Sequence, residues 1–189
     1  MRKTPVITLL VALLIFGFYF ISTHSSKPAS NPSPTPTNQS ANATPASNQV
    51  LGARTKTEGC QAQGALPDKA CTPGATFPNV TKDDVCTPGY SQKVRNVPPS
   101  IKDIVFSEYG IASHQPGQYE VDHFISLELG GSNEIANLWP ESADPRPGYH
   151  EKDKAENYLH QQVCNGSISL QQAQQMISNN WIDVYHHID

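Results

Sequence analysis

The segment spanning residues 119–141, YEVDHFISLELGGSNEIANLWPE, decides the fold of this chain. It begins with an alternation typical of a β-strand, which places odd-numbered residues on one face and even-numbered residues on the other. Residues 130–133, Gly-Gly-Ser-Asn, predict a turn because glycine adopts positive φ without steric cost. A second short strand is predicted at residues 137–139, and it should end at Pro140, which has no N–H for a strand partner.

Two helices are predicted after this segment. The first begins near His150, after a loop broken by prolines, and ends near Val163, with apolar residues recurring on one face. The second begins after Ser169, where Ser169 and Gln172 have the spacing of a capping box. A shorter helix is expected before the strands, from Ser100 to Gly110. The order of strands and helices predicts an α+β fold.

Several features of the 119–141 segment together resemble the HNH nucleases, also called the ββα-metal class. They are the pair Asp122-His123, the Gly130-Gly131 turn, Asn137 with the leucine that follows it, and the polar helix beyond. The longer string is similar to a secreted bacterial branch of HNH-like proteins. The resemblance implies a ββα-metal finger with flanking helices and one divalent metal ion (Mg²⁺, Mn²⁺ or Zn²⁺).

The resemblance also implies a role for each residue of the site. It makes His123 the general base that activates water, Asp122 a metal ligand and Asn137 the residue that orients the histidine. The family usually has a further histidine about nine residues after the asparagine, but this chain has Arg146 there. His150 is favoured as the second ligand, with Asp153 as its rival.

This chemistry would suit hydrolysis of phosphodiester bonds. An imidazole near its free pKa can take a proton from water at neutral pH, and a metal ion can stabilise the charge that develops on phosphate. The function expected is therefore a metal-dependent endonuclease of DNA, or of RNA, with little sequence specificity. The alternative is a catalytically inactive HNH-fold module that binds a ligand or associates with the cell envelope.

The N-terminal quarter of the chain predicts export. Residues 1–22 place Arg2 and Lys3 before a long apolar run, as in a signal peptide or an uncleaved signal anchor in the membrane. Residues 23–50 are rich in Ser, Pro, Thr and Asn, a composition that predicts a disordered linker. The protein is therefore expected outside the cytoplasm, either anchored to the membrane or secreted, and no obligate protein partner is inferred.

The remaining residues predict one domain, made of an irregular arm at 51–99 and an HNH-like unit at 100–189. All seventeen acidic residues lie after residue 50, with ten of the thirteen basic residues, so this part is net negative. That balance disfavours a protein held on duplex DNA by many phosphate contacts. Arg95, shortly before the motif, is a candidate for contacting a single phosphate, with an ordinary surface charge as the alternative.

The four cysteines, Cys60, Cys71, Cys86 and Cys164, predict two disulfides in an exported chain. Three pairings are possible. Cys71 and Cys86 each begin the sequence Cys-Thr-Pro-Gly, and this repeat predicts two similar turns. We favour a bridge between these two turns, which leaves Cys60 to pair with Cys164.

Overall fold

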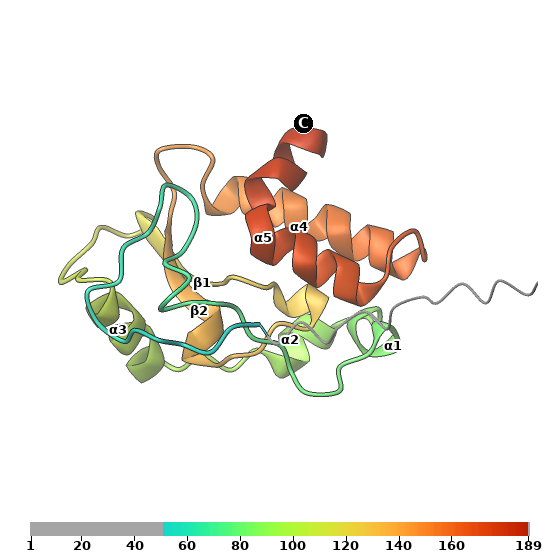
Figure 1. The fold of residues 1–189 in the computed structure, drawn as a ribbon, viewed down its shortest axis with the longest axis horizontal. Helices are drawn as coiled ribbons and strands as arrows, with labels where there is room; N and C mark the ends of the chain where they lie inside the picture. The colour runs from blue at the N-terminus through green and yellow to red at the C-terminus, as the bar shows by residue number, and fades with distance from the viewer. Residues whose placement is uncertain (1–50, 189) are drawn as a thin grey trace, which may run out of the picture. The chain divides into compact units, whose positions relative to one another are not determined.

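The computed structural model describes residues 51–188, and they form an α+β fold as predicted (Figure 1). The elements, in chain order, are α1 (Lys82–Val85), α2 (Tyr90–Val94), α3 (Pro99–Glu108), β1 (Tyr119–His123), η1 (Leu127–Leu129), η2 (Ile135–Asn137), β2 (Leu138–Ser142), α4 (Tyr149–Cys164) and α5 (Leu170–Ile188). The predicted export segment and linker lie outside the described residues. Within residues 51–188, no helix has the length and apolarity needed to cross a membrane.

The two strands pair antiparallel, with Val121 opposite Pro140 and Asp122 opposite Trp139. The prediction that Pro140 ends the second strand is wrong, because β2 continues to Ser142. A two-stranded sheet explains the difference. Each strand has one free edge, so a residue without an N–H is tolerated where that position faces away from the partner.

The two faces of the hairpin pack against different helices. Val121 and Leu138 lie on one face and contact Val105 of α3, and this small cluster forms one part of the core. Trp139 lies on the other face and belongs to the larger core with Leu159 of α4 and residues of α5. Figure 1 shows α4 and α5 side by side, away from α3. The hairpin therefore separates two apolar clusters.

The predicted starts of α4 and α5 agree with the structure to within one residue. Thr81 and Asp84 form the capping box of α1, and Ser169 and Gln172 bond to each other at the start of α5. Ser100, expected as the N-cap of α3, lies inside the helix instead, because α3 begins at Pro99, two residues before the start that this cap implies. Proline suits this first helical position because its missing N–H has no partner in the first turn.

The predicted disulfide pairing is wrong. Cys60 bonds to Cys71 and Cys86 bonds to Cys164. The two Cys-Thr-Pro-Gly turns look alike in sequence but lie in different surroundings. The Cys71 turn sits near the end of α3, whereas Cys86 follows α1, which packs on α4. Because structural disulfides persist in oxidising compartments, the two bridges point to an extracytoplasmic environment.

The arm before α3 holds the loop of the hairpin in place. The Gly74 N–H donates to the carbonyl oxygen of Ala136 at 2.9 Å, and Thr76 forms an isolated antiparallel bridge with Gly131. Farther along the hairpin, the Thr72 hydroxyl lies 3.1 Å from the Leu138 carbonyl oxygen. These contacts fix the loop that leads from β1 to β2.

Candidate active site

His123 is the last residue of β1, and its imidazole is buried with 2% of the residue exposed. Its Nε2 atom lies 3.0 Å from Oδ1 of Asn133, whereas Nδ1 is buried without a hydrogen-bond partner among the described residues. The amide oxygen can only accept, so Nε2 carries the proton and Nδ1 keeps its lone pair. Burial lowers the pKa of His123 and outweighs the raising effects of the Asp122 charge and the Asn133 hydrogen bond. The imidazole is therefore neutral at neutral pH.

Asn137 contacts the residues that follow His123, not the imidazole itself. Its side-chain oxygen accepts from the Ile125 N–H at 2.9 Å, and its amide nitrogen donates to the carbonyl oxygens of Ile125 and Ser132. Its own carbonyl oxygen accepts from the N–H of Phe124 at 2.7 Å. Asn137 thus closes the loop after β1, and the side chain that bonds the imidazole is that of Asn133.

Asp122 points to the opposite face of β1 from His123, toward α4. Its Oδ2 atom lies 2.5 Å from Nζ of Lys152. The same Nζ donates to the His123 carbonyl oxygen at 2.8 Å and to the Glu156 carboxylate. Burial raises the pKa of Asp122, but the Lys152 ammonium outweighs this effect and holds that pKa below its ordinary value. Asp122 is therefore ionised and already paired with a cation.

Two further carboxyl groups lie near this pair and are harder to ionise. Burial raises the pKa of Glu156 to about 7 despite the adjacent Lys152. Within residues 51–188, no donor reaches either carboxyl oxygen of Glu141, and burial raises its pKa well above the ordinary value. In its protonated form Glu141 becomes a donor itself, and the Asp122 carboxylate is the neighbour that can accept. The side chains of Asp122 and Glu141 from the hairpin and of Lys152 and Glu156 from α4 therefore form one cluster of ionisable groups between the hairpin and α4.

The other predicted site residues lie at the surface near this cluster. His150 is exposed, and its ring lies tilted against that of Tyr149, with ring centroids 4.3 Å apart. Asp153 is exposed and within electrostatic range of both Asp122 and His150. Arg95 is also exposed, and its charge reaches His123, where it lowers the pKa of the imidazole.

The residues around Asp122 do not fit a divalent ion bound through that carboxylate. Mg²⁺ binds carboxylate oxygen at about 2.0–2.1 Å, and here the Lys152 ammonium already lies 2.5 Å from Asp122 Oδ2. An added ion would stand beside a buried positive charge, where repulsion is weakly screened. Lys152 supplies the positive charge that this carboxylate requires.

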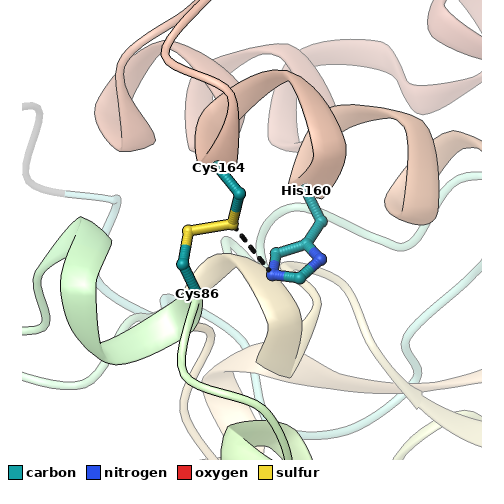
Figure 2. A group of neighbouring side chains, drawn as sticks. All are labelled: Cys86, His160 and Cys164. Atoms are coloured by element: carbon teal, nitrogen blue, oxygen red, sulfur yellow. Dashed lines mark hydrogen bonds between the residues drawn. A yellow bond between two sulfur atoms is a disulfide. The ribbon is translucent and has the colours of Figure 1, made fainter.

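One other cluster has metal-ligand chemistry. Among the described residues, Cys86, His160 and Cys164 place one ligand atom each within 4.8 Å of one another, whereas Asp122, His150 and Asp153 form no such group. Figure 2 shows that the two sulfurs are bonded to each other and that the His160 ring faces Cys164. The distance from His160 Nε2 to Cys164 Sγ is 3.4 Å. The group could hold a metal ion, but its cysteines form a disulfide and offer no thiolate in this structure.

Sequence reasoning missed Lys152 and Asn133. Lys152 precedes Ala155, Leu159 and Val163 by three, seven and eleven residues, so it lies on the buried face of α4. A lysine on that apolar stripe is a signal that it has a buried partner. Asn133 gave no comparable signal, because an asparagine in the sequence Gly-Gly-Ser-Asn is equally typical of an ordinary turn.

Comparison with protein families, with characterised proteins and with solved structures finds no match to this chain. The chemistry of the site therefore rests on its own residues.

Proposed function

We propose that this chain is an endonuclease that hydrolyses phosphodiester bonds of DNA, or of RNA, with His123 as the general base. The observation that carries the proposal is the buried Nδ1 atom of His123, which has no hydrogen-bond partner in the described part of the chain. A buried nitrogen without a hydrogen bond is costly, so it calls for an explanation such as a role in catalysis. Water bound to a substrate phosphate would be the partner of this lone pair.

The electrostatics of His123 suit this role. A general base must be unprotonated when it acts, and the pKa of His123 is lowered by burial. The hydrogen bond from Nε2 to Asn133 fixes the ring, so the lone pair of Nδ1 has a defined direction. Arg95 supplies an exposed positive charge near the same imidazole, and its guanidinium is suited to a bidentate phosphate contact.

The test is plasmid nicking by His123 variants. His123→Ala should reduce nicking about 10²- to 10⁴-fold, the usual contribution of a positioned proton acceptor. His123→Gln keeps a side-chain amide that can donate to Asn133, so it controls for loss of folding. His114→Ala is the matched histidine control, since His114 is exposed in the loop before β1. Activity that persists in a folded His123→Gln protein would overturn the proposal.

The dependence on a divalent ion is measured in the same assay. Each protein is assayed with Mg²⁺, with Mn²⁺ and with a chelator, on both DNA and RNA. Loss of nicking with the chelator would favour the metal-dependent form of the reaction, with His150 or Asp153 as ligands. Retained nicking would favour a reaction that relies on side-chain cations.

A second candidate function is favoured by a specific observation. The imidazole of His123 is 2% exposed and Asp122 is neutralised by Lys152, so both residues also suit a purely structural role. Under this hypothesis the chain is a non-enzymatic binding or envelope-associated module. It predicts that wild-type protein shows no nicking under any of the three conditions and that His123→Gln alters stability alone.

A further inference from the structure

We propose that the ammonium group of Lys152 is the resident cation at the junction between the hairpin and α4, and that the wild-type protein binds no divalent ion there. The junction consists of the Asp122 carboxylate, the His123 carbonyl oxygen, Lys152 and Glu156. This inference concerns cation binding alone, and it holds whether or not the chain is a nuclease.

The hydrogen bonds of Lys152 are complete. A lysine ammonium has three N–H donors and no acceptor. In this structure Nζ reaches Asp122 Oδ2 at 2.5 Å, the His123 carbonyl oxygen at 2.8 Å, and the Glu156 carboxylate. All three donors therefore have oxygen partners, and the ammonium is fully satisfied in its place at the junction.

Burial makes this arrangement hard to displace. Lys152 is 1% exposed, and a buried ammonium is strongly disfavoured unless it is paired. A divalent ion that took Asp122 and Glu156 would leave Lys152 buried without a counter-charge. An ion that bound beside Lys152 would add two positive charges to a region where solvent screens poorly.

Lys152 also acts as a positioning residue for His123. Its Nζ binds the backbone carbonyl of His123 and the side chain of the residue before it, so it ties the end of β1 to the first turn of α4. The side chain of His123 points to the other face of the strand. Lys152 therefore fixes the backbone that carries the imidazole without touching the ring.

The first experiment uses the wild-type protein. Mn²⁺ is titrated into the protein and followed by calorimetry and by paramagnetic broadening of backbone amide signals. The expected result is no saturable binding at the junction and no selective broadening at Asp122, Lys152 or Glu156. Stoichiometric binding with selective broadening of these amides would overturn the inference, and this result needs no variant.

The second experiment removes the resident cation. Lys152→Ala leaves the oxygens of Asp122, Glu156 and the His123 carbonyl around a vacated space, and hard divalent ions accept such oxygen ligands. This variant should lose thermal stability and regain part of it when Mn²⁺ is added, with broadening at the same amides. Lys154→Ala is the matched control, because Lys154 is exposed on the same helix and lies over the ring of Tyr185.

The comparison of the two variants decides the second experiment. If a folded Lys152→Ala protein binds Mn²⁺ no better than Lys154→Ala does, the inference is contradicted. The oxygens at the junction would then not form a cation site even when the lysine is removed. If Lys152→Ala does not fold, the titration of the wild-type protein decides alone.

Discussion

The side-chain amide of Asn133 connects His123 to the segment that carries Arg95. Its oxygen accepts from Nε2 of His123 at 3.0 Å and from the Asn96 N–H at 3.1 Å, while its nitrogen donates to the Val94 carbonyl oxygen at 2.8 Å. One amide thus sets the tautomer of the imidazole and the path of the neighbouring backbone. Any change to it should be visible in the titration of His123.

Two substitutions of Asn133 should move the pKa of His123 in opposite directions. In the wild type this pKa should lie below about 6.5, the ordinary value for histidine. Asn133→Asp places a carboxylate at Nε2, which favours the imidazolium and raises the pKa. Asn133→Ala removes the hydrogen bond that favours the charged form and lowers the pKa further. Titration of the His123 ring signals by NMR measures both, and shifts of the same sign would contradict this account.

The lowered pKa of His123 in the wild-type protein also determines how the stability of the fold depends on pH. Folded His123 binds its proton at a lower pH than it does in the unfolded chain, so the unfolded state binds more protons between the two pKa values. The stability that neutral His123 contributes is therefore complete above about pH 6.5, and it is lost as pH falls toward the folded pKa. In Asn133→Asp this loss should shrink, because the folded pKa approaches the unfolded one.

At the scale of elements, the alternation in residues 119–123 and the apolar stripe of the following helix were sufficient to predict β1 and α4. Both signals come from the local period of the chain, which is fixed by backbone geometry. Contacts between residues far apart in the sequence have no such local signal. Nothing in the local pattern showed that Pro140 would continue β2 at an open edge, or that Asp122 would meet Lys152 thirty residues later.

The loop between the strands also has features that the sequence predicted and features that only the structure shows. The sequence identified Gly130 and Gly131 as a turn, but only the structure separates their roles. Gly130 has φ of +77°, a conformation that favours glycine, whereas Gly131 lies against backbone. A Cβ atom at Gly131 would meet the Ile125 carbonyl group and approach Asn137 Nδ2 to 2.9 Å. Close approach, which no sequence pattern reports, explains the second glycine.

Gly131→Ala should therefore destabilise the protein by about 1–3 kcal/mol or more, because the clash is with backbone and cannot be relieved by a rotamer change. Gly52→Ala is the matched control. A Cβ atom there would lie 3.6 Å from Cβ of Pro73, an ordinary contact, so its effect should stay within about 0.5 kcal/mol. Urea unfolding followed by circular dichroism compares the two. Equal effects would mean that the loop after β1 adapts more freely than its hydrogen bonds indicate.

At the scale of the whole described unit, the arm and the last helix are joined by contacts between residues far apart in sequence. Trp181 Nε1 of α5 donates to the Ala65 carbonyl oxygen at 2.8 Å, and Arg54 pairs with Glu108 at the end of α3. Such contacts form only when the chain is closed into long loops, and closing a loop costs entropy in proportion to the logarithm of its length. The two disulfides reduce that cost by very different amounts.

The bridge from Cys86 to Cys164 should stabilise the fold more than the bridge from Cys60 to Cys71. Their partners are 78 and 11 residues apart, and loop-closure entropy then gives contributions of about 4.5 and about 2.8 kcal/mol. The test replaces each pair with alanine, since Cys60 and Cys71 are buried and a serine hydroxyl there would add a penalty of its own. Urea unfolding of the two double variants should show a larger loss for Cys86→Ala/Cys164→Ala, by about 1.7 kcal/mol. A larger loss for the short bridge would mean that its packing near α3, and not the length of the loop it closes, determines its contribution.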